Sequence, residues 1–219
     1  MRRLLAVAAL VLALATLASA QEQRWDFQLG GGVTLPAGSI SQRFETGWHF
    51  TGGAGWRFGE HLGLRLDFTH TRERLVGTAL PQAFIGGQHR VESLEVDARW
   101  TIDPTAAVPV ELRAGPGLYR RRTEITSVSD DTPGPSVCDP WLQVCAEGPV
   151  SPDDILGSRS STDPGFNIGA AVAIPIWRSL RLFIDLRWRF VWGDTYGLPG
   201  EPSQRSTASY FPLSFGLRF

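Results

Sequence analysis

Fourteen charged residues in this sequence have a spacing that could build an interlocked network of ion pairs. Arg65 and Asp67 are separated by one residue, and so are Glu111 and Arg113. Residues two apart point to the same side of a β-strand, so each pair would share one face. In a narrow space such a network would act as a plug or, if it could open, as a small gated pore. The full set is Asp26, Arg57, Arg65, Asp67, Glu95, Asp97, Arg99, Glu111, Arg113, Arg181, Asp185, Arg187, Arg189 and Arg218.

The four histidines offer less chemistry. His49 shares a polar strand face with Thr51, His61 falls in a predicted turn, and His70 lies near a strand end. A His, a Ser and an acid on neighbouring strands would be needed for a nucleophilic triad. The sequence holds no recognisable constellation of that kind. We therefore predict no catalytic residue, no cofactor and no metal site, and a protein that is not an enzyme.

Cys138 and Cys145 are the only cysteines and fall in the longest predicted loop. In an exported protein we expect them to form a disulfide, because that compartment is oxidising. The loop-entropy relation gives about 2.5 kcal/mol for so short a ring. The ring would enclose Trp141, which could contact an extracellular partner or pack onto its own loop.

Residues 1–20 have the features of a secretory signal peptide. Arg2 and Arg3 precede an apolar run from Leu4 to Leu17, and Ala18-Ser19-Ala20 forms a small-residue cleavage site. The run is shorter than the roughly 20 residues that span a bilayer, which counts against an uncleaved anchor. We predict cleavage after Ala20 and one domain over residues 21–219. No later segment has the pattern of a spanning helix, so membrane insertion would have to use strands.

Eight segments alternate between apolar and polar residues and are predicted to be strands. Short connections (59–61, 103–107, 177–179) alternate along the chain with long ones (35–47, 72–93, 120–165, 193–208). This asymmetry is typical of an outer-membrane barrel, with turns in the periplasm and loops outside the cell. The predicted strands are 25–34, 48–58, 62–71, 94–102, 108–119, 166–176, 180–192 and 209–219.

All fourteen charges fall on the less apolar face of their strands. In residues 180–192, for example, Leu182, Ile184 and Leu186 alternate with Asp185 and Arg187. A charge at the lipid midplane costs about 2–4 kcal/mol, so these charges are expected to line a lumen. A soluble sandwich or lipocalin-like barrel would alternate in the same way with its apolar face inward. Aromatic residues at strand ends favour the membrane barrel.

Pro116 falls inside a predicted strand, where it lacks the N–H that a closed ladder needs. We expect a bulge or a strand end at that position.

Two stretches resemble the small outer-membrane β-barrel family, which includes OmpA-type transmembrane domains, OmpX-type proteins and opacity-type porin-family proteins. GGAGWRFGEHLGLRLDF (52–68) is similar to its strand–turn–strand hairpins, and FPLSFGLRF (211–219) is similar to its closing strand. The resemblance implies an all-β, eight-stranded antiparallel up-and-down transmembrane barrel in the bacterial outer membrane. It also implies that Phe215, Leu217 and Phe219 signal to the barrel assembly machinery. No OmpA-type peptidoglycan-binding domain follows, so a role in anchoring the cell wall is not supported.

Two functions remain from the sequence. The formal net charge of −1 becomes −3 when Arg2 and Arg3 leave with the signal peptide, which is no signature of a nucleic-acid binder. Acids in 123–165 also argue against polyanion binding by that segment. We expect a monomeric, non-enzymatic surface protein that contacts outer-membrane lipids and, through its loops, an extracellular partner. The alternative is a narrow porin-like channel for small solutes, and a lipid-modifying enzyme is less favoured.

Overall fold

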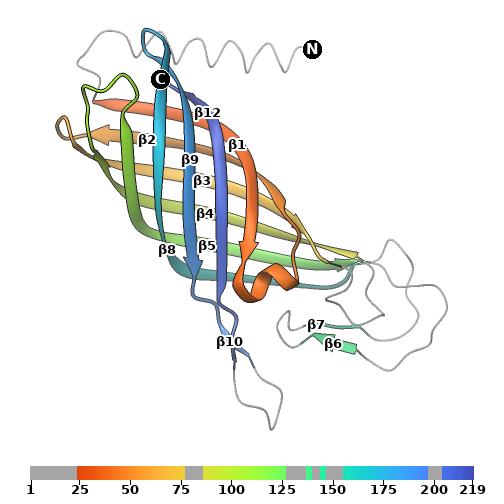
Figure 1. Cartoon of the computed structure of the whole chain (residues 1–219). Coiled ribbons are helices and arrows are strands. Elements are labelled where there is room, and N and C mark those ends of the chain that lie inside the picture. Colours follow the sequence, from red (N-terminus) through yellow and green to blue (C-terminus); the bar gives the residue numbers. More distant parts are fainter. Residues whose placement is uncertain (1–23, 77–85, 127–136, 140–143, 147–154, 197–203) are drawn as a thin grey trace.

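The chain forms a closed β-barrel. The computed structural model describes residues 24–76, 86–126, 137–139, 144–146, 155–196 and 204–219. Eight antiparallel strands close in the order β1-β12-β9-β8-β5-β4-β3-β2, which confirms the predicted fold class (Figure 1). They are β1 (Trp25–Ala37), β2 (Gly47–Arg57), β3 (Leu62–Arg74), β4 (Gly86–Thr101), β5 (Val110–Thr126), β8 (Ile155–Trp177), β9 (Leu180–Val191) and β12 (Ala208–Arg218).

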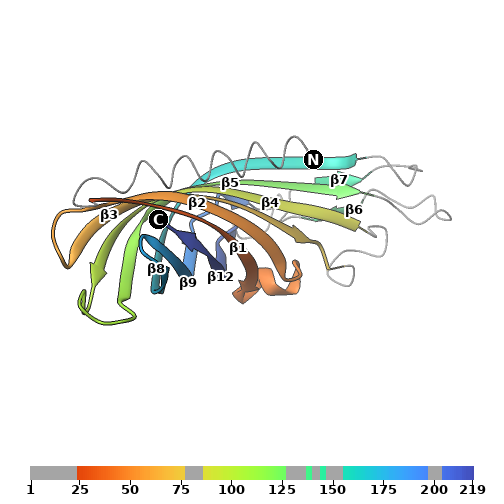
Figure 2. The ribbon, with the colours of Figure 1, turned by 90° about the horizontal axis from the view of Figure 1, so that it is seen from above.

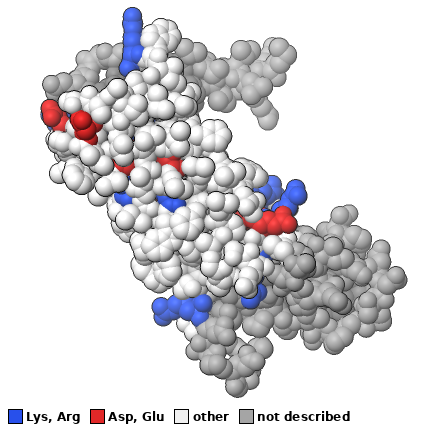
Figure 3. Space-filling view, in the orientation of Figure 1, with Lys and Arg blue, Asp and Glu red and all other residues white. Residues whose placement is uncertain are grey.

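The apolar face of the strands points outward. Phe68 is 45% exposed, whereas its neighbour Asp67 is 0% exposed. A soluble sandwich or lipocalin-like barrel would show the reverse, so the alternation belongs to an inside-out barrel. Figure 3 shows that the middle of the visible face is mostly uncharged and that charged side chains gather toward its ends.

The two ends of the barrel differ, and we call them the turn end and the loop end. At the turn end lie the short connections 58–61, 102–109 and 178–179, together with the C-terminus (Figure 1). In one of these turns Thr105 donates from its hydroxyl and its amide to Asp103 Oδ1, over 2.7 and 3.0 Å. These hydrogen bonds lower the pKa of Asp103, because they favour its charged form.

At the loop end lie the longer connections, which contain short elements of their own. These are the 3₁₀ helix η1 (Gly38–Gln42) and two small hairpins, β6 (Val137–Asp139) with β7 (Val144–Ala146) and β10 (Thr195–Tyr196) with β11 (Gln204–Arg205). Among the described residues no helix is long and apolar enough to cross a membrane.

Five strands extend three or more residues farther toward the loop end than predicted, β1 and β3 by three residues and β4, β5 and β8 by seven or more. β4 begins at residue 86 rather than 94, β5 ends at 126 rather than 119, and β8 begins at 155 rather than 166. The loop predicted for 120–165 is therefore reduced to the connection 127–154. The prediction failed because outward residues here are polar, as at Arg122 and Ser160, so no apolar face marks the strand. Figures 1 and 2 show β4, β5 and β8 reaching beyond β1 at this end.

Pro116 lies in the middle of β5, at an interruption of the ladder. Pairing between β4 and β5 runs from Gly86 to Glu95, stops, and resumes in the same register at Ala98. The bulge or strand end expected at Pro116 is therefore absent. Because Pro116 lacks an N–H, the β4–β5 ladder is interrupted between Glu95 and Ala98. At this interruption Asn167 Nδ2 donates to the Gly115 carbonyl over 3.3 Å.

Candidate functional site: the charged lumen and its two mouths

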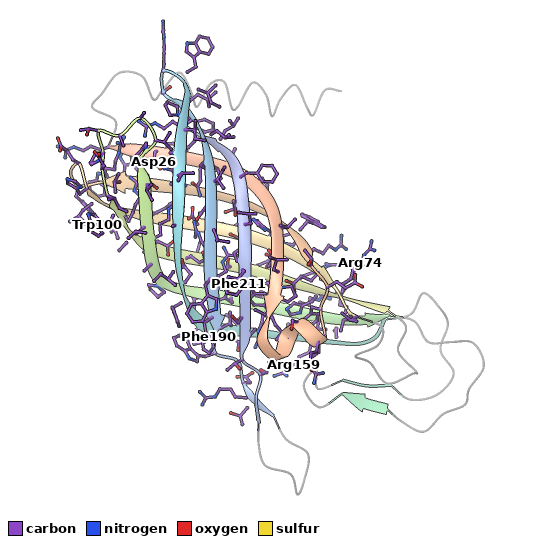
Figure 4. All side chains as sticks on the ribbon, in the orientation of Figure 1. Asp26, Arg74, Trp100, Arg159, Phe190 and Phe211 are labelled. Carbon is purple, nitrogen blue, oxygen red and sulfur yellow. The ribbon has the colours of Figure 1, made fainter. Side chains whose placement is uncertain are left out.

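The turn end of the lumen is held by carboxylates that each accept from arginines. Arg65 Nη1 and Arg99 Nη1 donate to the two oxygens of Asp26 over 2.7 and 2.6 Å. Arg218 Nη1 donates to Glu111 Oε1 over 2.7 Å. Figure 4 shows Asp26 near the C-terminal end of the barrel. Such charge-assisted hydrogen bonds fix both partners because each geometry is directional.

Arg187 is the centre of the lumen. Its guanidinium donates to Glu95 Oε2 over 2.8 Å, to Asp97 Oδ2 over 3.0 Å and to Asp185 Oδ2 over 2.8 Å. It also donates to Asp67 Oδ2 over 2.5 Å. One cation from β9 therefore connects carboxylates of β3, β4 and β9 across the barrel.

Two further arginines join the turn-end layer to this centre. Arg65 Nε donates to Asp67 Oδ1 over 2.8 Å while its Nη1 contacts Asp26. Arg113 donates to Asp185 over 2.8 Å and to Glu111 over 2.9 Å. The network is thus continuous along the lumen rather than a stack of separate pairs.

Glycines on the inner face make room for these side chains. A Cβ on Gly53 would overlap Asp67 Oδ1, and a Cβ on Gly169 would lie 2.8 Å from Arg187 Cγ. Any larger residue at Gly53 would displace a carboxylate of the network, because protein interiors tolerate no such overlap.

His49 lies in a hydrogen-bonded chain beside the network. Its Nε2 is 2.7 Å from Ser214 Oγ and its Nδ1 is 2.9 Å from Thr34 Oγ1. The arrangement has the Ser–His contact of a triad, but a neutral hydroxyl stands where a carboxylate would stabilise an imidazolium. Both partners are buried, Ser214 at 8% and Thr34 at 1% exposure, so no substrate reaches them in this conformation. We therefore interpret the hydrogen bonds from Thr34 through His49 to Ser214 as structural.

The β1–β2 connection covers the loop-end mouth of the lumen. Ile40 and Phe44 are 0% and 1% exposed, and Phe44 stacks on His89 with ring centroids 4.3 Å apart. Phe44 also forms a β-bridge with Leu75. Glu73, the cross-strand partner of His89, is 1% exposed, and its two oxygens have no hydrogen-bond partner among the described residues.

A second set of polar contacts at the loop end escaped the sequence analysis. Arg121 Nε donates to Asp163 Oδ2 over 2.8 Å, and Arg121 Nη1 donates to the Ser206 carbonyl over 3.0 Å. His89 Nε2 is 3.2 Å from the Tyr210 hydroxyl. One pattern in the sequence could have indicated that the strand continues here. Residues of β4 alternate between inward and outward positions past Leu94, the last apolar outward residue, and His89, Val91 and Ser93 face inward.

The predicted lumen residues divide into two groups. Arg57 and Arg181 are only half-buried and lie at the turn-end mouth. The other twelve are at most 7% exposed and lie inside the barrel. They are Asp26, Arg65, Asp67, Glu95, Asp97, Arg99, Glu111, Arg113, Asp185, Arg187, Arg189 and Arg218.

The residues expected to guide assembly lie on the closing strand. Phe215 and Leu217 are outward, at 61% and 39% exposure. Phe219 was expected on the same exposed face, but it is 7% exposed and lines the turn-end mouth. Its backbone closes the barrel by exchanging two hydrogen bonds of 2.9 Å with Phe27.

The cysteine loop is described only in part. Cys138 and Cys145 are direct cross-strand partners in the β6–β7 ladder. Their side chains, together with Trp141 and the signal peptide 1–20, lie outside the described residues, so the disulfide and the Trp141 contact stay predictions.

Arginines form a row on the outer face of the extended strands. Arg72 on β3 lies directly opposite Arg90 on β4, which lies directly opposite Arg122 on β5. Glu124 contacts Arg122 over 2.8 Å and Arg90 over 3.5 Å. Like charges in direct cross-strand contact are destabilising, and Glu124 offsets part of that cost together with Gln88, whose Oε1 accepts from Arg72 over 3.0 and 2.6 Å. Figure 4 shows Arg74 and Arg159 at the same end.

The lumen therefore resembles a filled core more than a passage. Buried ion pairs occupy its middle, and apolar side chains cover its loop-end mouth. Within the described ranges no group of His, Cys, Asp or Glu is arranged to hold a metal ion.

Comparisons with known proteins agree with this architecture. The family described as outer membrane protein beta-barrel domain matches residues 6–219. Neisserial surface protein A has a similar structure, with 16% identity and a TM-score of 0.52, over 89% of this chain and 95% of that chain. A major outer membrane protein of Thermus thermophilus gives 13% identity and a TM-score of 0.54, over 89% of this chain and 98% of that chain. At such identities the likeness concerns the fold alone. A comparison with curated protein sequences finds no match.

Proposed function

Because this chain belongs to the outer membrane protein beta-barrel domain family, we propose that it is a non-enzymatic surface protein whose filled barrel presents a basic binding face at the loop end. We orient the barrel in the outer membrane with its short turns in the periplasm, so the turn end faces the periplasm and the loop end faces the outside of the cell. The proposal includes export with cleavage after Ala20 and a monomeric barrel.

The observation that carries this proposal is the Arg72–Arg90–Arg122 row. Leu94 and Leu118 are the last apolar outward pair on β4 and β5, and Arg90 and Arg122 follow four residues farther along each strand. At roughly 3.3 Å per residue the row lies about 13 Å farther along the strands than that pair, or about 10 Å along the membrane normal for strands tilted by about 35–45°. Outward Trp48 is the cross-strand partner of Arg72, so the row lies at the level of the headgroups. It therefore meets the surroundings of the cell surface rather than lipid tails.

The chemistry of the row favours an anionic partner. Arginine guanidiniums bind phosphate and sulfate groups through paired hydrogen bonds. On the outer faces of β3, β4 and β5 in this extension, five arginines (Arg72, Arg74, Arg90, Arg120, Arg122) outnumber Glu92 and Glu124. We infer that the partner carries phosphate or sulfate groups on a surface glycan.

Binding to a model polyanion tests this function. The folded barrel in detergent should bind dextran sulfate but not uncharged dextran, and added salt should weaken that binding. The double variant Arg90→Gln/Arg122→Gln should lose about tenfold or more in affinity. Arg24→Gln, which changes an exposed arginine at the turn end, is the matched control and should bind like wild type. Equal binding by wild type and the double variant would contradict the proposal.

The channel alternative rests on the same lumen. The lumen could conduct ions only if Arg187 separated from its carboxylate partners and the cover formed by Ile40 and Phe44 moved. The filled lumen supports the surface role over this alternative.

A further inference from the structure

The periplasmic mouth of the barrel contains a cavity that the surface function does not use. Its volume is about 100 Å³. The floor is formed by lumen residues, including Arg99 and Arg218, and the rim by turn residues, including Arg178 and Ser179. Arg178 is exposed, so the cavity is open to solvent on the periplasmic side.

Arginine dominates the charge around this cavity. It is lined by Arg57, Arg99, Arg178, Arg181 and Arg218 and by the acids Asp26, Glu60 and Glu111. Asp26 already accepts from two arginines, and Glu111 is within 2.9 Å of both Arg113 and Arg218. Glu60 is exposed in the β2–β3 turn. The negative charges of Asp26 and Glu111 are therefore already matched by arginines other than those at the rim.

Two rim arginines leave positive charge unmatched. Within the described part of the chain neither Arg178 nor Arg181 forms an ion pair. At the floor, Arg99 lines the cavity and its Nη1 donates to Asp26 Oδ2 over 2.6 Å, so a further guanidinium stands behind the rim arginines.

The backbone at the rim gives an independent observation. Arg178 has φ of +40°, the one positive value at a non-glycine residue among those described. Arg178 lies in the two-residue turn 178–179 between β8 and β9, where tight hairpin geometry requires positive φ. This turn therefore fixes a guanidinium at the edge of the cavity.

From these observations we propose that the periplasmic mouth is a binding site for a small oxyanion of the phosphate class, held between Arg99 at the floor and Arg178 and Arg181 at the rim. Paired guanidinium donors match the oxygens of a phosphate group. A cavity of this size holds several waters or one such group, which excludes a nucleotide or an oligosaccharide from its interior. The group can be a free anion or the exposed end of a larger periplasmic molecule.

Calorimetry on the full-length mature barrel, folded in a zwitterionic detergent, tests this site. Inorganic phosphate is the probe for a free anion, and glycerol 3-phosphate is the probe for a headgroup. At constant ionic strength in chloride, wild type should bind at least one of them with 1:1 saturation. Binding of only one identifies the source of the phosphate group.

The variant Arg178→Gln/Arg181→Gln should weaken that binding about tenfold or more. Both positions lie outside the buried network, so the variant should keep its heat-modifiable gel mobility. Arg205→Gln, which changes an exposed arginine of the β10–β11 hairpin outside both proposed sites, is the matched control and should bind like wild type. Absence of saturable binding of both probes to wild type would overturn the proposal, and so would equal weakening by Arg205→Gln. If dextran sulfate failed to bind at the loop end, the proposed surface function would fall but the oxyanion site at the periplasmic mouth would not, because the two sites share no residue.

Discussion

Arg187 on β9 and Asp67 on β3 meet in a hydrogen-bonded ion pair across the lumen, although 120 residues separate them in the chain. Both residues are shielded from bulk solvent, at 4% and 0% exposure. The pair exists only when the ring is closed, so it couples the side-chain network to the strand order. This coupling makes the lumen a determinant of the fold as well as a barrier.

Replacing Arg187 by Met should be strongly destabilising. The change leaves Asp67, Glu95, Asp97 and Asp185 without their shared cation. Removing one partner of a buried ion pair typically costs about 3–5 kcal/mol in the free energy of unfolding. Urea unfolding of the barrel in phospholipid vesicles measures it. Arg181→Met, at the half-buried mouth, is the control and should change that free energy by less than about 0.5 kcal/mol. Similar effects of both variants would show that the network is not the cause.

Replacing Glu73 by Met should stabilise the barrel. The carboxylate is 1% exposed and accepts no hydrogen bond from the described residues, so its desolvation is not offset. An apolar side chain of similar length should raise the free energy of unfolding by about 1–3 kcal/mol. The same urea measurement applies, with the half-exposed Glu92→Met as control. A lower stability of Glu73→Met than of wild type would mean that the carboxylate has a partner.

Replacing Gly53 by Ala should disrupt the network by overlap. The added methyl would overlap Asp67 Oδ1 and would lie 2.6 Å from the Leu66 carbonyl oxygen. Overpacking of this kind typically costs about 1–3 kcal/mol. Gly59→Ala is the control, because a Cβ there meets nothing within 4 Å. If the two variants unfold at the same urea concentration, the inner face is looser than the structure indicates.

Replacing Phe219 by Ala should reduce assembly in cells more than folding in vitro. The hydrogen bonds to Phe27 come from the backbone and survive the change, whereas the aromatic ring is the proposed signal to the assembly machinery. We expect a lower outer-membrane yield but a near-normal refolded fraction in detergent. Phe215→Ala, at 61% exposure, should assemble better than Phe219→Ala. A normal outer-membrane yield of Phe219→Ala would refute the signal.

Much of this architecture could be predicted from the sequence, because membrane strands have a two-residue period that reports both faces at once. Strand 180–192 shows this, since Leu186 and Arg187 point in opposite directions with 51% and 4% exposure. The prediction failed where that contrast ends. Outward Arg90 and Arg122 are as polar as their inward neighbours, so the sequence of the extended parts of β4 and β5 has no apolar face that predicts a strand.

The Arg72–Arg90–Arg122 row was out of reach for the same reason. Each arginine belongs to a different strand, and only the register of β3, β4 and β5 brings them side by side. The cover over the lumen was equally hidden, because Ile40 and Phe44 lie in a connection that has no period. Glu73 could be seen in the sequence, but its lack of a partner depends on which side chains fold over it.

Bilayer conductance tests the central claim, that the barrel is filled and closed, most directly. Purified wild-type protein in a planar bilayer should give no stable channel, because Arg187 and its carboxylates fill the lumen and Phe44 covers its outer mouth. Stable, uniform wild-type channels that respond to lumen substitutions such as Gly53→Ala but not to deletion of residues 127–154 would contradict the account and establish a pore instead.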